Sequence, residues 1–153
     1  MSHPRVLITG CSSGIGRALA DTFAQQGYEV WASARNSEDV ARLSEAGFNA
    51  VQLDVNDAAA VEQLAITLQA RIGGLDVLIN NAGYGHEGVL EESPLSEMQR
   101  QFDVNVFGAV AVAKAFLPRF RHRRSGFVVN VTSMGGLILS LIHISEPTRL
   151  RRI

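Results

Sequence analysis

The sequence predicts an α/β protein with a doubly wound parallel sheet in a three-layer α/β/α arrangement. Short apolar runs alternate along the chain with longer segments whose apolar residues recur at helical spacing. The short runs are almost continuously apolar, which is typical of strands buried on both faces. Since strand, helix and strand follow one another repeatedly, we expect parallel strands with helices on both faces of the sheet.

The first half of the chain contains two strand–helix units. Residues 6–8 are apolar throughout and predict a buried strand. Apolar residues recur at helical spacing over 15–26, and Gly27 follows, as expected because glycine favours the end of a helix. The pattern then repeats as a strand at 28–34, a helix at 37–46 closed by Gly47, and a strand at 48–53.

The second half continues this order. Asp57 can cap a helix that runs to about residue 71. A continuous apolar run at 75–79 predicts the fourth strand. Ser96 then opens a long helical stretch reaching about residue 121, with a break expected near Asn105. Residues 127–131 predict the fifth strand.

The composition is ordinary for one globular domain. Of 153 residues, 46% are hydrophobic and 19% are charged, and the net charge is −1. This balance argues against nucleic acid or a membrane surface as a partner. Cys11 is the single cysteine, which fits a reducing compartment, and the apolar segment near the N-terminus is too short for a signal peptide. We therefore expect a cytoplasmic protein, and we expect no metal site.

Small, polar or charged residues follow every expected strand. Ligands of open parallel sheets bind outside the carboxyl ends of the strands. Convergence at all five ends is more informative than any single motif, and it predicts a ligand site there. The residues in question are Thr9-Gly10-Cys11-Ser12-Ser13-Gly14-Ile15-Gly16, then Arg35, Asp54, Asn80-Asn81-Ala82-Gly83 and Thr132-Ser133.

The glycine-rich turn after the first strand suits a pyrophosphate. Gly10 permits a tight turn out of the strand. Gly14 and Gly16 lack side chains, so a phosphate and the sheet can approach the backbone closely. The helix that begins near Gly14 directs its free N–H groups and the positive end of its dipole toward this place.

These motifs together resemble the short-chain dehydrogenase/reductase family over about residues 4 to 138. Thr-Gly-x-x-x-Gly-Ile-Gly at 9–16 looks like the family's cofactor motif, and Asn80-Asn81-Ala82-Gly83 is similar to its second fingerprint. Asn105, Ser133 and Asp54 match the family's helix-breaking asparagine, its catalytic serine and its adenine-contacting aspartate. The resemblance implies a Rossmann fold with strand order 3-2-1-4-5.

The resemblance also implies a role for each matching residue. Asn105 would organise a water in a proton relay, and Ser133 would hydrogen-bond the substrate oxygen; these are the catalytic residues expected here. The cofactor residues divide into three groups. The pyrophosphate would lie against Gly10, Gly14, Ile15 and Gly16, the adenine against Asp54 and Val55, and the ribose region against Asn81, Ala82 and Gly83. Ser12 and Ser13 of the same turn are also expected to bind the cofactor.

The end of the second strand favours NADP over NAD. An acid there would bind the ribose 2′-hydroxyl and indicate NAD. The strand instead ends in Ala34-Arg35, and the next acid is Glu38. The planar guanidinium of Arg35 can pair with a 2′-phosphate, and Ser33 could add a hydroxyl.

The C-terminal segment departs from the family. A Tyr-x-x-x-Lys pair is expected near position 146, but Glu146 and Leu150 stand there, and Pro147 interrupts the helix that should carry the pair. Residues 140–153 resemble translated sequencing-adapter DNA, so we expect a native domain at 1–139 followed by a non-native tail. The later strands of the family fold would then be absent, leaving the fifth strand as an exposed edge.

The sequence therefore predicts the cofactor-binding part of an NADP-dependent oxidoreductase that transfers hydride between nicotinamide and an alcohol or carbonyl substrate. The chain as written is expected to be inactive, and the parent protein is expected to form a homodimer or homotetramer. Two alternatives stay open. One is a non-catalytic nucleotide- or partner-binding module, and the other is an epimerase or dehydratase of the wider superfamily.

Overall fold

A computed structural model describes residues 3–86, 88–89 and 91–133. Within them, five parallel strands form one sheet in the order β3-β2-β1-β4-β5, which confirms the predicted doubly wound topology. Each strand lies within about two residues of the range that its apolar run predicts. The strands are β1 (Arg5–Ile8), β2 (Glu29–Ala34), β3 (Asn49–Gln52), β4 (Val77–Asn80) and β5 (Phe127–Asn130).

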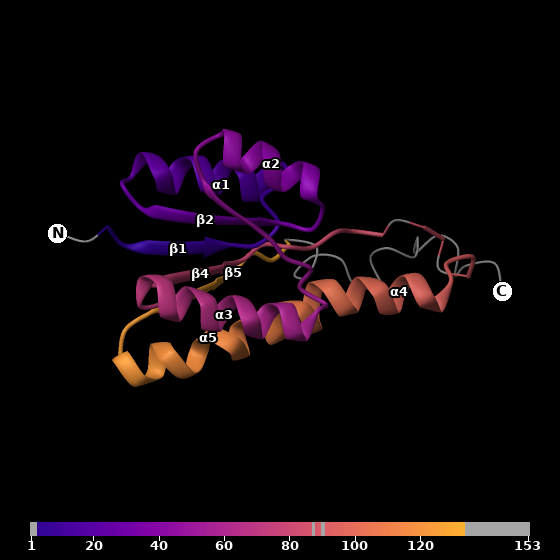
Figure 1. The fold of residues 1–153 in the computed structure, drawn as a ribbon. Coiled ribbons are helices and arrows are strands. Elements are labelled where there is room, and N and C mark those ends of the chain that lie inside the picture. The colour runs from indigo at the N-terminus through magenta and orange to yellow at the C-terminus, as the bar shows by residue number, and fades with distance from the viewer. Residues whose placement is uncertain (1–2, 87, 90, 134–153) are drawn as a thin grey trace.

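The helices cover both faces of the sheet. In Figure 1, α1 and α2 lie on one face and α3 and α5 on the other, while α4 extends beyond the ends of the strands. This arrangement gives the three layers that the sequence predicts. The helices are α1 (Gly14–Gln25), α2 (Ser37–Glu45), α3 (Ala58–Ile72), α4 (Leu95–Phe102) and α5 (Ala109–Arg123), with a π-helical segment, η1 (Asp103–Gly108), between the last two.

The core consists of two apolar layers, one on each side of the sheet. Successive residues of a strand point to opposite faces. Leu7 of β1 accordingly packs in the layer that contains Phe116 of α5, whereas Val6 and Ile8 pack in the layer that contains Ala20 of α1. Because all of these side chains are at most 4% exposed, the central strands are buried on both sides, as their continuous apolar runs predict.

Capping residues fix where two of the helices begin. The Asp57 side chain accepts a hydrogen bond from the Ala60 N–H at 3.0 Å, which confirms its predicted capping role for α3. Asn36 does the same for α2 by accepting from the Asp39 N–H at 2.8 Å. Gly73 ends α3 in the left-handed conformation, with φ of 74°. These local signals fix the residues at which α2 and α3 begin and the residue at which α3 ends.

The long helical stretch differs in detail from its prediction. It begins at Leu95 rather than Ser96, with Pro94 as the residue before the helix. The break expected near Asn105 is η1, a wider π-helical turn that continues directly into α5. Gly108 allows this segment to approach the loop that follows β3, because a Cβ at that position would lie 2.6 Å from Cγ2 of Val55.

The β5 strand is an edge strand of the described sheet. Within the described residues it pairs with β4 alone, and Phe127 and Val129 are 70% and 45% exposed. Across the same part of the chain, no helix is long and apolar enough to span a membrane. The predictions that concern Glu146, Pro147, Leu150 and the tail at 140–153 lie outside the described residues.

Candidate functional site

A cleft of about 480 Å³ lies at the carboxyl ends of the strands. It gathers residues from the ends of β1, β2, β3 and β4, as expected for an open parallel sheet. Every predicted binding residue except Gly14 lines it. These residues are Gly10, Ser12, Ser13, Ile15, Gly16, Arg35, Asp54, Val55, Asn81, Ala82 and Gly83.

Thr9 and Asn81 join the ends of β1 and β4 at the base of the cleft. The buried Thr9 hydroxyl oxygen accepts hydrogen bonds from the backbone N–H groups of Asn81 and Ala82, both at 3.0 Å. In return, the Asn81 side-chain amide donates to the carbonyl oxygens of Thr9 and Gly10, also at 3.0 Å. The glycine-rich turn is therefore held against β4 by four hydrogen bonds between segments about 70 residues apart in the chain.

The glycines of the turn leave no room for side chains. A Cβ on Gly16 would lie 2.2 Å from the carbonyl oxygen of Gly10 and 2.4 Å from the amide nitrogen of Asn81. A Cβ on Gly10, where φ is +71°, would lie 2.8 Å from Cα of Ala82. Both positions therefore require glycine. At Gly16, α1 packs on the turn and on the Asn81 side chain, and at Gly10 the turn packs on the backbone of Ala82.

Gly14 is the first residue of α1 and has a different environment. Its φ is +56°, and a Cβ there would meet no heavy atom within 4 Å. The side chain of Ser13, which precedes it, makes no capping hydrogen bond to the helix. Free N–H groups in the first turn of a helix attract anions. The start of α1 can therefore accept a phosphate group without any side chain being displaced.

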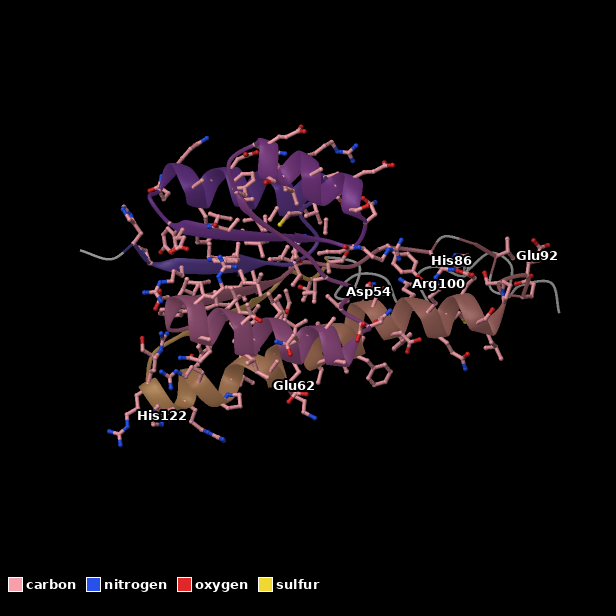
Figure 2. All side chains as sticks on the ribbon, in the orientation of Figure 1. Asp54, Glu62, His86, Glu92, Arg100 and His122 are labelled. Atoms are coloured by element: carbon pink, nitrogen blue, oxygen red, sulfur yellow. The ribbon has the colours of Figure 1, made fainter. Side chains whose placement is uncertain are left out.

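The end of β3 supplies another part of the cleft lining, with Leu53, Asp54 and Val55. The Asp54 carboxylate accepts a hydrogen bond from the Asn56 N–H at 3.0 Å, which forms a local turn. Val55 is 6% exposed and packs in the core, so its position is fixed. Asp54 and Arg100, a residue of α4 that also lines the cleft, lie toward the same end of the molecule, beyond the strands (Figure 2). This part of the lining combines an apolar surface with one carboxylate.

Asn105 lies beside the cleft rather than in its lining. Its side-chain oxygen accepts from the Tyr84 N–H at 3.0 Å, and its amide donates to the Tyr84 carbonyl oxygen at 2.8 Å. A Cβ on Gly83 would lie 3.0 Å from the same side-chain oxygen. Asn105 therefore positions the loop after β4, which forms part of the cleft.

Ser133 lies three residues after the end of β5 and is exposed. It does not line the cleft. Ser133 thus follows β5, and Asn105 contacts the loop that follows β4. Both expected catalytic residues lie near the carboxyl edge of the sheet, but neither lines the cleft.

The end of β2 differs from the sequence-based interpretation in two respects. Arg35 is exposed and lines the cleft, as expected, but Ser33 is 1% exposed and is not a lining residue. Ser33 is instead covered by the turn, where its carbonyl oxygen accepts from the Cys11 N–H at 2.7 Å. The suggestion that Ser33 adds a hydroxyl to the site is therefore wrong. Of the two acidic residues that follow the end of β2, Asp39 lines the cleft and Glu38 does not.

Several lining residues were missed by the sequence analysis. Arg100 of α4 stacks its guanidinium 5.9 Å from the ring centroid of Tyr84 and forms a 3.3 Å ion pair with Glu97. No local pattern connects α4 with the strand ends, so these contacts required the tertiary structure. Asp39 could have been found, because it shares a helical face with the buried Leu43. The missed lining residues are Ala34, Asn36, Asp39, Leu53, Tyr84, Arg100 and Val104.

Cys11 belongs to the glycine-rich turn but does not line the cleft. It is fully buried, and its thiol donates to the Ile8 carbonyl oxygen at 3.2 Å. Burial raises the pKa of Cys11 from 9.0 to about 12, although the backbone hydrogen bond at Ser33 and the charge of Arg17 lower it slightly. The thiol is therefore protonated at neutral pH.

No cluster of His, Cys, Asp and Glu side chains among the described residues could hold a metal ion.

We expect the Cys11 thiol to resist modification by a disulfide reagent at pH 8 in the native chain and to react readily in urea. Because its pKa is raised on folding, its contribution to stability is fully present below pH 9 and is lost as the pH rises toward about 12. The free energy of unfolding of the wild type should fall over this range relative to Cys11→Ala. Equal labelling rates in buffer and in urea would contradict the burial.

Comparisons with known proteins agree with this geometry. A family model described as short chain dehydrogenase matches residues 4–143. A 3-ketodihydrosphingosine reductase of Bacteroides thetaiotaomicron is 37% identical over 134 residues, which cover 87% of this chain and 48% of that protein. Retinol dehydrogenase 8 of Bos taurus is 44% identical over 142 residues, which cover 86% of this chain and 45% of that protein.

Solved structures show the same similarity. The crystal structure of a short-chain dehydrogenase from Streptomyces avermitilis has a TM-score of 0.85 and 40% identity, covering 92% of this chain and 52% of that one. The structure of ElxO with NADP bound has a TM-score of 0.83 and 30% identity, covering 89% of this chain and 58% of that one. The chain spans about half the length of the curated relatives that it matches.

Proposed function

Because the chain belongs to the short-chain dehydrogenase family, we propose that it forms the NADP-binding part of an oxidoreductase that interconverts an alcohol and a carbonyl. The observation that carries the proposal is the cleft, which brings the glycine turn, Arg35, Asp54 and the Asn81 segment together at the strand ends. A dinucleotide suits this lining, because the lining combines the open start of a helix, apolar side chains and a basic side chain.

The residues of the cleft suit each part of the cofactor. The open start of α1 around Gly14 would bind the pyrophosphate through backbone N–H groups. Asp54 and Val55 would contact the adenine, and the Asn81 segment would border the ribose region. The bound cofactor would supply the hydride chemistry, and the protein's part would be binding and orientation.

Two residues are proposed to act on the substrate. Ser133 would donate a hydrogen bond to the substrate oxygen, and Asn105 would order a water for proton transfer. In the 153-residue chain Glu146 and Leu150 stand where the family's tyrosine and lysine are expected. We therefore propose that this chain binds cofactor without turning over substrate. Oxidation of NADPH by the purified chain with a ketone would contradict that part of the proposal.

We expect the chain to bind NADPH more tightly than NADH because Arg35 can pair with the 2′-phosphate. Arg35→Ala should weaken NADPH binding by about tenfold and leave NADH binding almost unchanged. Fluorescence titration of the reduced nicotinamide measures both dissociation constants. Arg71→Ala is a matched control, since Arg71 stacks over Trp31 at 5.7 Å and lies outside the cleft. Tighter binding of NADH by the wild type would overturn the NADP preference.

An exposed apolar stripe supports the proposed homodimer or homotetramer of the parent protein. Phe102, Val106, Val110 and Leu117 follow one another along α4, η1 and α5, and each is 43% to 59% exposed. Such a stripe on a helical surface is typical of an interface. Sedimentation velocity of a variant with a charged residue at Val110 tests this interface, and we expect the substitution to dissociate the oligomer. An unchanged oligomeric state would contradict the proposed interface. The cytoplasmic location stays a prediction.

A further inference from the structure

An acidic side chain that the sequence analysis did not identify lies at the Arg35 end of the cleft. Asp39 is 8% exposed and lines the cleft together with Arg35 and Asn36. It is the third residue of α2, and its backbone N–H is held by the Asn36 cap at 2.8 Å. The cap and the packing of the helix therefore fix a carboxylate beside the position where a ribose would meet the end of β2.

Arg35 and Asp39 would favour different cofactors. A guanidinium attracts a 2′-phosphate, whereas a carboxylate accepts a hydrogen bond from a 2′-hydroxyl and repels a phosphate. An unpaired buried carboxylate beside Arg35 would therefore oppose the binding of NADP. Which cofactor binds more tightly therefore depends on whether another residue neutralises the charge of Asp39.

Arg42 provides that neutralising charge. Its guanidinium forms an ion pair and a hydrogen bond with the Asp39 carboxylate, one helical turn further along α2. The Arg42 side chain is 66% exposed and does not line the cleft, whereas the Asp39 side chain is 10% exposed. Arg42 therefore reaches the site from outside and contacts it through Asp39.

We propose that the Asp39–Arg42 ion pair determines cofactor selectivity, with Arg42 neutralising a carboxylate that would otherwise exclude a 2′-phosphate. This inference rests on the proposed function, in that the cleft holds a nicotinamide dinucleotide. Asp39 is the specificity-determining residue, and Arg42 is a positioning residue that acts through it. Without Arg42, the same carboxylate would accept the 2′-hydroxyl of NAD.

A purely structural role of the pair makes a different prediction. Ion pairs between residues three apart on a helix contribute modestly to stability. If the pair only stabilised α2, its loss would weaken the binding of both cofactors equally and leave their ratio unchanged. The ratio of the two dissociation constants, rather than either one alone, therefore separates selectivity from stability.

The test measures NADPH and NADH binding by the full 153-residue chain and by Arg42→Ala, Asp39→Asn and the double variant. Arg42→Ala should lower the preference for NADPH by about tenfold, as expected for one uncompensated charge beside the phosphate. Asp39→Asn should preserve or raise the preference. The double variant should match Asp39→Asn, because no carboxylate is left for Arg42 to neutralise. Arg17→Ala removes a similar ion pair, with Asp21 of α1, and should leave the ratio unchanged.

Each other outcome has a distinct meaning. The inference would be overturned if Arg42→Ala left the ratio of the two dissociation constants unchanged. It would also be overturned if Arg42→Ala lowered the NADPH preference equally in the wild type and in Asp39→Asn. Either result would leave the proposed function intact. If the wild type bound NADH more tightly, the NADP preference would be overturned. The inference would still hold if Arg42→Ala shifted the ratio in the wild type but not in the Asp39→Asn variant. Binding of neither cofactor would overturn both.

Discussion

Gly16→Ala is expected to abolish tight NADPH binding and to lower the free energy of unfolding by about 3 kcal/mol. The added Cβ would lie 2.2 Å from the Gly10 carbonyl oxygen and 2.4 Å from the Asn81 amide nitrogen. Neither neighbour can move freely, because the Asn81 amide donates to Thr9 and Gly10 at 3.0 Å. The helix must therefore move away from the turn, which disrupts the site where the pyrophosphate is proposed to bind.

Urea unfolding and NADPH fluorescence titration measure the two effects of Gly16→Ala separately. Gly85→Ala is the matched control, since a Cβ at Gly85 meets nothing within 4 Å and the residue does not line the cleft. It should change neither stability nor binding appreciably. Wild-type stability and affinity in Gly16→Ala would show that α1 does not pack on the turn as described.

Thr9→Val is expected to lower the free energy of unfolding by about 3 kcal/mol, because two backbone N–H groups would lose their shared acceptor. The Thr9 hydroxyl accepts from Asn81 and Ala82 at 3.0 Å, and Thr9 is 1% exposed, so water cannot readily replace it. Valine has nearly the same shape, which separates loss of the hydrogen bonds from loss of packing. The exchange rates of the Asn81 and Ala82 amide protons should rise as well.

Two variants control this experiment. Thr9→Ser keeps the hydroxyl and should lose only about 1 kcal/mol, the contribution of one buried methyl group. Thr22→Val removes a hydroxyl that donates to Ala18 on the exposed side of α1, and it should change stability by less than about 0.5 kcal/mol. Equal destabilisation by Thr9→Val and Thr9→Ser would mean that the hydroxyl does not link the two strands.

Both predictions concern the same small region, where the ends of β1 and β4 meet the start of α1. The glycine turn and the Asn81 segment lie about 70 residues apart in the chain. Their side chains and backbones bind one another through four hydrogen bonds. A substitution in either motif is therefore expected to affect both stability and binding.

The sequence by itself determined the strands, the helices and most of the cleft lining. Apolar periodicity, the Asp57 cap and the glycines after helices are local signals, and each acts within a few residues of the element it defines. The parallel order then placed polar strand ends at one edge. For this reason Gly10, Arg35, Asp54 and Asn81 could be assigned to one site before its geometry was known.

Only the tertiary structure decided which side chains reach that site. Ser33 is hidden because the Cys11 turn packs over the end of β2, and Asp39 enters the cleft because α2 turns its buried face toward the sheet. Asn105 contacts Tyr84 from a π-helical turn that apolar spacing could indicate only as a break. These outcomes depend on contacts between segments distant in sequence, whose angles and separations are set by packing, so no pattern of neighbouring residues determines them.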